Sequence, residues 1–120
     1  MTKTRILVAF EDEYRAYREF MAGAVRAHRP HVEVTVAGLG ALGEEVARFD
    51  PDLVICSLPN IVDPDGRPAW LELPPDPERL AKICLDGEHS ETTNPALEEL
   101  LWVVDETERL VRTKQYLGNC

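Results

Sequence analysis

Two short runs of purely apolar residues constrain the fold of this chain most strongly. Ile6–Phe10 and Leu53–Cys56 contain no polar side chain, and both end in polar or acidic sequence. Such runs are typical of strands that are buried on both faces of a parallel sheet. Because parallel strands are joined by crossover connections, we expect helices in the sequence between them.

The sequence between these runs has the pattern of a helix, a strand and a second helix. From about Glu13, apolar residues recur three and four positions apart until Arg29-Pro30 ends the pattern. Val32–Val36 alternates and is β-branched, which favours a strand near a sheet edge. Leu42–Phe49 is a short amphipathic helix. The order β-α-β-α-β predicts parallel strands, arranged 2-1-3, with right-handed crossovers.

The second half of the chain has a different pattern. Ala69–Leu73 and Lys82–Leu85 have the composition of strands, and the segment between them is too short for a parallel crossover. We therefore expect an antiparallel hairpin, which either extends the sheet beside the third strand or folds out as an arm. Asp86–Asn94 is mostly polar and is predicted to be an exposed loop. A long last helix follows Asn94-Pro95 and runs to roughly Lys114.

Together these elements predict one α/β domain over residues 1–120. Its expected architecture is a three-layer sandwich with a β-α-β-α-β parallel core (order 2-1-3), then an antiparallel hairpin and a long C-terminal helix. The tail, residues 115–120, is expected to fray. A chain of 120 residues with 44% hydrophobic side chains has the size of a single core.

Charge and cysteine content limit the partners and the compartment. Thirteen Lys and Arg against 22 Asp and Glu give a net charge of −9, which argues against nucleic acid or an anionic membrane surface as the partner. No apolar run approaches the ~18 residues of a membrane span. Cys56, Cys84 and Cys120 are an odd number without CxxC spacing, so we expect no disulfide and a reduced, cytoplasmic protein.

Two stretches resemble the receiver domains of response regulators. Arg5–Glu13 is similar to the first strand of that family, where an apolar run ends in an acidic cluster that binds Mg²⁺. Pro51–Pro59 is similar to its third strand, and Asp63–Gly66 to its Asp-Gly turn. The resemblance covers about the first half of the chain. It implies a flavodoxin-like scaffold.

The chain departs from this family at the residues of phosphoryl transfer. Ser57 (or Cys56, if the register slips by one) stands where the family has its phosphoacceptor aspartate, and Asp86-Gly87 stands where it has a lysine. A serine hydroxyl without a neighbouring base does not replace a carboxylate. We therefore predict a pseudo-receiver that is not phosphorylated on aspartate. It would act in signal transduction by binding a protein partner or a second copy of itself, as a homodimer, rather than as an enzyme.

The alternative hypothesis is a small metal-dependent enzyme or ligand-binding domain. Glu11 and Asp12 follow the first strand, at the sheet edge where ligands of α/β proteins bind, with Ser57 nearby. Two carboxylates at this edge suit a hydrated Mg²⁺. A purely local role is also open, because acids at this position favour the start of the following helix.

Tryptophan and arginine residues are the candidates for a protein interface. Trp70 lies on a predicted strand and Trp102 on the last helix, at the border of its apolar stripe. Exposed tryptophan is enriched in interface cores. Arg15 and Arg18 belong to a basic stripe along the first helix, which is either a solvated face or a docking surface for an acidic partner.

Overall fold

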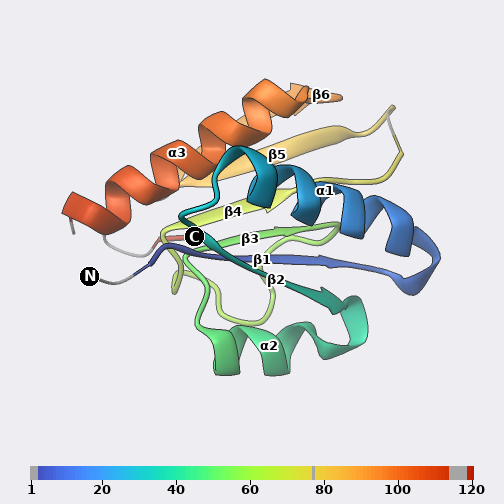
Figure 1. The fold of residues 1–120 in the computed structure, drawn as a ribbon, viewed down its shortest axis with the longest axis horizontal. Coiled ribbons are helices and arrows are strands. Elements are labelled where there is room, and N and C mark those ends of the chain that lie inside the picture. Colours follow the sequence, from blue (N-terminus) through green and yellow to red (C-terminus); the bar gives the residue numbers. More distant parts are fainter. Residues whose placement is uncertain (1–2, 77, 114–118) are drawn as a thin grey trace.

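The computed structural model describes residues 3–76, 78–113 and 119–120. These residues form a six-stranded sheet and three α-helices (Figure 1). The strands are β1 (Arg5–Phe10), β2 (Glu33–Gly38), β3 (Leu53–Cys56), β4 (Ala69–Glu72), β5 (Leu80–Leu85) and β6 (Glu88–Thr93). The helices are α1 (Arg15–His28), α2 (Leu42–Phe49) and α3 (Leu97–Thr113), and the 3-10 turns η1 (Asp12–Tyr14) and η2 (Leu39–Ala41) precede α1 and α2.

The sheet has the strand order β2-β1-β3-β4-β5-β6. β1 pairs in parallel with β2 and β3, and its central Val8 lies opposite Val36 on one side and Ile55 on the other. This confirms the predicted parallel core and its 2-1-3 order. β4 and β5 form the predicted antiparallel hairpin. The hairpin extends the sheet, because β4 pairs in parallel with β3.

The core lies on both faces of the sheet. Side chains alternate along a strand, so Ile6 and Val8 pack with α1 and α3, whereas Leu7 and Ala9 pack with α2. Figure 1 shows α1 and α3 on one side of the sheet and α2 on the other. Every side chain of Ile6–Phe10 is fully buried, which explains why this run has no polar residue.

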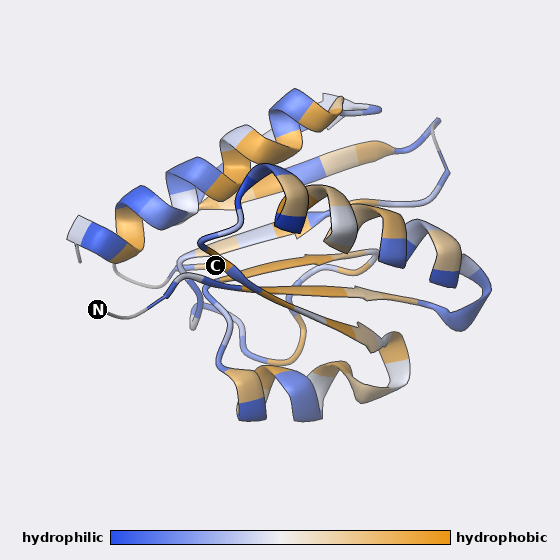
Figure 2. Cartoon of the chain, in the orientation of Figure 1, coloured by the Kyte–Doolittle hydropathy of each residue, from blue (hydrophilic) through white to orange (hydrophobic). Residues whose placement is uncertain are grey.

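The prediction of a loop over Asp86–Asn94 is wrong, because β6 pairs with β5 along its whole length, whereas the predicted exposure of this segment is confirmed. Asp86 and Gly87 have φ values of 51° and 86°, and Leu85 lies opposite Glu88. Two positive φ values in a two-residue connection are those of a type I′ hairpin turn. β6 has a loop-like composition because it is the edge strand, where polar side chains protect against aggregation. In Figure 2 the inner strands are largely orange, whereas β6 is pale.

The prediction of unpaired cysteines is also wrong, because Cys84 and Cys120 form a disulfide with a Cα–Cα distance of 5.9 Å. Residues 115–118 of the expected frayed tail lie outside the described part of the chain, but Cys120 is buried rather than frayed. The pairing joins residues 36 positions apart, a contact that only the folded sheet creates. The cysteines therefore no longer support a reduced, cytoplasmic protein. Cys56 is free and buried, as expected for a small core residue.

No helix among the described residues is both long enough and apolar enough to span a membrane.

Candidate functional site

The residues of the predicted metal site, Glu11 and Asp12, and the nearby Ser57 lie where β1 and β3 end. This is the edge of the sheet to which the arrowheads of β1, β2 and β3 point in Figure 1. Ser57 follows β3 and donates its hydroxyl hydrogen bond to Glu11 Oε1, at 2.8 Å. The second carboxylate oxygen, Glu11 Oε2, is buried and has no hydrogen-bond partner among the described residues. The predicted proximity of Glu11 and Ser57 is therefore confirmed. Only one of the two Glu11 carboxylate oxygens accepts a hydrogen bond from the described residues.

Asp12 does not join this pair directly. It begins η1, and its side chain is 94% exposed, with Oδ1 3.7 Å from the guanidinium nitrogen Nη1 of Arg18. An ion pair at this distance and exposure is weak. The described residues contain no cluster of three or more His, Cys, Asp or Glu side chains that suits a metal ion.

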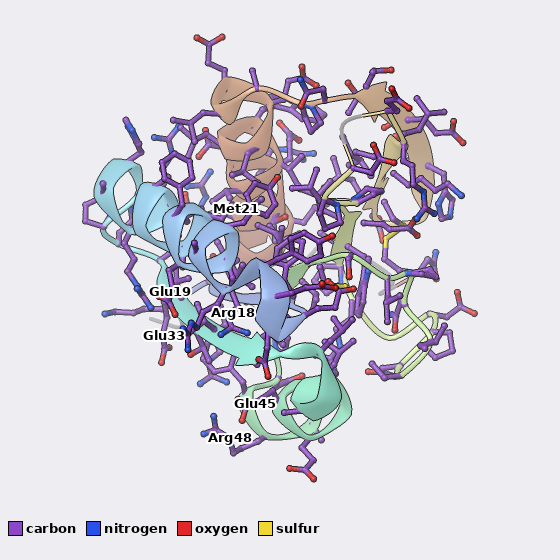
Figure 3. The ribbon with its side chains drawn as sticks, turned by 90° about the vertical axis from the view of Figure 1, so that its right-hand side faces the viewer. Arg18, Glu19, Met21, Glu33, Glu45 and Arg48 are labelled. Atoms are coloured by element: carbon purple, nitrogen blue, oxygen red, sulfur yellow. A yellow bond between two sulfur atoms is a disulfide. The ribbon has the colours of Figure 1, made fainter. Side chains whose placement is uncertain are left out.

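Arg18 is the buried cation of this edge and not a member of a surface stripe. Its side chain is only 9% exposed, and Nη1 donates to the carbonyl oxygens of Phe10 (3.2 Å) and Ala37 (3.1 Å). These carbonyls belong to β1 and β2, so the guanidinium joins two strands at the site. Figure 3 shows Arg18 on the side of α1 that is turned toward the sheet.

Gly38 makes room for this arrangement. A Cβ atom at position 38 would lie 3.2 Å from Asp12 Oδ1 and 3.8 Å from Arg18 Nη1. The glycine therefore permits the close approach of the β2 backbone to both charged groups. Gly38, the last residue of β2, and Gly40, in η2, therefore help to shape this edge.

A hollow of about 380 Å³ opens beside the two carboxylates. It is lined by Glu11, Asp12, Gly38, Leu39, Gly40 and Ala41. Its side-chain polar groups are hydrogen-bond acceptors, which suit a small cation or a ligand rich in N–H and O–H donors.

The two tryptophans differ sharply in exposure. Trp102 is 51% exposed on the outer side of α3, whereas Trp70 is 3% exposed and donates from its indole Nε1 to the Leu58 carbonyl at 2.8 Å. Burial leaves Trp70 little surface to offer a partner. Phe20 on α1 is 70% exposed. Phe20 and Trp102 therefore present exposed aromatic side chains on α1 and α3.

The other arginines of the predicted basic stripe, along α1 and just beyond its end, are engaged to different degrees. Arg29 binds Asp105 of α3 through two hydrogen bonds of 2.6 and 2.8 Å, and this contact lowers the pKa of the Asp105 carboxyl. Arg26 donates to the Val34 carbonyl at 3.1 Å, and Arg15 is exposed. The predicted basic stripe is therefore divided between the sheet, α3 and solvent.

Cys56 is not a nucleophile in this structure. Burial raises the pKa of its thiol to about 12, and Sγ donates to the Leu58 carbonyl at 3.0 Å. The thiol is therefore protonated at neutral pH, and thiols react as thiolates.

A second hollow, of about 340 Å³, lies on the opposite face of the hairpin from α3 and was not predicted from the sequence. Its lining includes Trp70, Lys82, His89 and the Cys84–Cys120 disulfide. The register places Cys84 between Trp70 and His89 across three strands. The Asp86-Gly87 dipeptide is the signal that could have revealed it, because a hairpin turn at this position puts His89 opposite Cys84.

A buried arginine, Arg67, also escaped prediction. Its guanidinium binds Asp50 (2.5 Å), Asp63 (2.6 Å) and the Pro51 carbonyl (2.9 Å). These contacts hold the 57–68 connection against the turn before β3. Arg67 also accepts, at its carbonyl, the backbone hydrogen bond of Cys120 at 2.9 Å.

Comparison with protein-family models, with curated proteins and with solved structures finds no match to this chain.

Proposed function

We propose that this chain is a receiver-like, non-catalytic interaction module that binds a protein partner or a second copy of itself and is not phosphorylated on aspartate. The scaffold in this proposal is a three-layer α/β sandwich. What supports it is the packing of α1 and α3 against one face of the sheet and of α2 against the other. The observation that carries the functional proposal is the half-exposed indole of Trp102.

Exposure of the large apolar side chain of Trp102 to water is energetically unfavourable, and a partner that covers it would remove this cost. Large aromatic side chains supply much of the binding free energy of protein interfaces, and an exposed tryptophan is a typical central residue of such surfaces. Its neighbours on α3 at positions three and four away are Glu98, Glu99, Asp105 and Glu106. The surface around Trp102 therefore combines an apolar centre with an acidic rim.

The groups at the carboxyl edge support a binding role rather than phosphoryl transfer. The Ser57 hydroxyl is engaged by Glu11, and the Arg18 guanidinium already brings a positive charge to within 3.7 Å of Asp12. A fixed cation in this place opposes the binding of a divalent cation through like-charge repulsion. Within this proposal, the edge stabilises the fold and the helices contact the partner.

Sedimentation velocity over a range of concentrations tests self-association. We expect the wild-type chain to associate as concentration rises, and Trp102→Ala to remain monomeric. Ile61→Ala is the matched control, because Ile61 is also a large exposed apolar residue (68% exposed) but lies on the 57–68 connection. A chain that is monomeric at every concentration, or equal association of both variants, contradicts self-association through Trp102.

One observation favours the alternative, a Mg²⁺-dependent or ligand-binding domain using Glu11, Asp12 and Ser57. Glu11 Oε2 is buried beside the 380 Å³ hollow and has no hydrogen-bond partner in the described part of the chain, whereas a buried carboxylate oxygen normally has one. Titration with Mg²⁺, followed by calorimetry and by native mass spectrometry with acetyl phosphate, separates the two functions. We expect no Mg²⁺ binding and no added phosphate mass. Binding that is lost in Glu11→Gln would favour the alternative.

A further inference from the structure

The Cys84–Cys120 disulfide lies where a core cluster borders a hollow: both cysteines are largely buried, and both line the hollow. The hollow of about 340 Å³ is also lined by Trp70, Lys82 and His89. His89 is exposed on β6, and its Nε2 lies 3.9 Å from Cys84 Sγ. A small molecule in the hollow would therefore meet the sulfur atoms, an imidazole and an ammonium group together.

Among the described residues, three hydrogen bonds hold Cys120 in addition to the disulfide. The Cys120 N–H donates to the Arg67 carbonyl at 2.9 Å, and the Cys120 carbonyl accepts a hydrogen bond from Asn60 Nδ2. Cys120 Sγ accepts from the Gly87 N–H at 3.3 Å. Cys84, in contrast, belongs to β5 and is paired with Trp70 of β4 and His89 of β6. When the disulfide opens, Cys84 stays in the sheet, whereas Cys120 is held by its three hydrogen bonds and by its packing in the core cluster.

We propose that the Cys84–Cys120 disulfide is a redox-active site that undergoes thiol–disulfide exchange with a low-molecular-weight thiol. His89 is the catalytic residue of this exchange, acting on the Cys84 sulfur. This inference is independent of the proposed interaction function, which concerns the outer faces of the helices.

The exchange takes place in two steps. The thiolate of the small thiol attacks Cys120 Sγ and forms a mixed disulfide with it, while the Cys84–Cys120 bond breaks and its electron pair leaves on Cys84 Sγ. His89 donates a proton from its Nε2 to this Cys84 thiolate and regains one from water. A second small thiolate then attacks the small-molecule sulfur of the mixed disulfide, and Cys120 leaves as a thiolate that takes a proton from water. Two small thiols are oxidised to one disulfide, and the protein disulfide is reduced to two thiols.

The free cysteine does not compete in this chemistry. Cys56 is completely buried and its thiol is protonated at neutral pH for the reason given above, so it does not attack the disulfide.

The test uses the oxidised full chain, reduced glutathione as the probe, and mass spectrometry after acid quenching and alkylation in denaturant. The oxidised chain takes up one alkyl group, at Cys56, and the reduced chain three. We expect glutathione to appear first as a mixed disulfide on Cys120 and then to yield the reduced chain, with oxidised glutathione reversing the reaction. His89→Gln should slow the first step by roughly tenfold, below the range for a well-aligned general acid because the 3.9 Å contact is long.

Glu88→Gln is the matched control, because Glu88 precedes His89 on β6 and projects to the other face of the sheet. Its rate should equal that of the wild type. The proposal is overturned if the folded chain resists glutathione and reacts only in urea, which is the behaviour of a structural disulfide. It is also overturned if glutathione is found on Cys84, or if the His89→Gln and Glu88→Gln variants react equally fast.

Discussion

Arg18 brings a guanidinium into the interior at the point where β1 and β2 end. Its burial is tolerated because Nη1 donates to two strand carbonyls, those of Phe10 and Ala37, and because Asp12 lies 3.7 Å away. The contribution of the ion pair is small, since Asp12 is almost fully exposed. The stabilising interaction is therefore the pair of hydrogen bonds to Phe10 and Ala37.

Replacing Arg18 with methionine should lower the free energy of unfolding by about 1–3 kcal/mol, because it removes two hydrogen bonds from a charged donor to strand carbonyl groups. Urea unfolding followed by circular dichroism measures this change. Arg15→Met is the matched control on the same helix, where an exposed side chain is lost, and it should change stability by less than about 0.5 kcal/mol. Equal effects of the two substitutions would show that the Arg18 hydrogen bonds contribute nothing.

Cys56 should make the protein less stable at high pH. Desolvation raises the pKa of its thiol from 9.0 to about 12, so the unfolded chain loses this proton at a lower pH than the folded chain. Between these values the folded state binds more protons, and the free energy of unfolding falls by up to about 1.4 kcal/mol per pH unit as pH rises.

Urea unfolding at about pH 8 and about pH 10.5 measures this loss, which falls within the range where an ordinary thiol but not a buried one ionises. The Cys56→Ala variant should lack this part of the pH dependence, although tyrosine and lysine titration remains in both proteins. If the two proteins lose the same stability between these pH values, the Cys56 thiol is not shielded from ionisation.

The site could be predicted from the sequence only where strand order determined it. Glu11 and Ser57 follow two neighbouring parallel strands, so their proximity comes directly from topology. Arg18 could not be recognised in this way, because helical periodicity places an arginine on the inner face without revealing which carbonyl groups it meets. The inward position of Trp70 could not be predicted either, and the sequence therefore suggested Trp70 as an interface residue. Its indole binds the Leu58 carbonyl, which belongs to a connection without regular structure.

At the scale of elements, the β5–β6 hairpin shows that a favourable turn sequence can outweigh a composition that does not favour a strand. The six residues of β6 contain no large apolar side chain, yet they pair in full register with β5. The turn residues Asp86 and Gly87 both have positive φ, which matches the twist of a two-residue hairpin. Fully apolar strands such as β1 can be predicted from the sequence, whereas a polar edge strand has to be inferred from its turn.

Gly87→Ala should lower the free energy of unfolding by about 1–2 kcal/mol, because a residue with a Cβ is strained at a φ of 86°. The new Cβ would also lie 2.9 Å from Asn119 Cβ, so the Cys120 segment has to shift. Gly23→Ala is the control of opposite sign. Nothing lies within 4 Å of its added Cβ in the interior of α1, and it should stabilise by about 0.5–1 kcal/mol. Thermal unfolding of both variants measures the difference.

Stabilisation of the Gly87→Ala variant would contradict the positive φ of the turn. In that case β6 would not be placed by a type I′ turn, and the position of His89 opposite Cys84 would lose its structural basis.

At the scale of the whole molecule, the two faces of the sheet are closed by different means. Two long helices cover one face, and they are tied together by the contact between Arg29 and Asp105. On the other face α2 packs with β1 and β3, and beyond it Leu58 and Cys120 belong to the same core cluster as Trp70 and Cys84. At the hairpin, this face of the sheet is therefore covered by the segment that the disulfide attaches, and the described residues form no helix there.

Reduction of the Cys84–Cys120 disulfide should lower the free energy of unfolding of the whole domain. A cross-link between residues 36 positions apart reduces the entropy of the unfolded chain, which corresponds to about 4 kcal/mol at 25 °C. Urea unfolding of the wild-type chain with and without dithiothreitol measures the loss. A Cys84→Ser/Cys120→Ser variant should resemble the reduced wild type and should not respond to the reductant. If the oxidised and reduced chains unfold at the same urea concentration, the Cys120 segment does not restrain the fold, and α2 with the 57–68 connection is sufficient to close this face of the sheet.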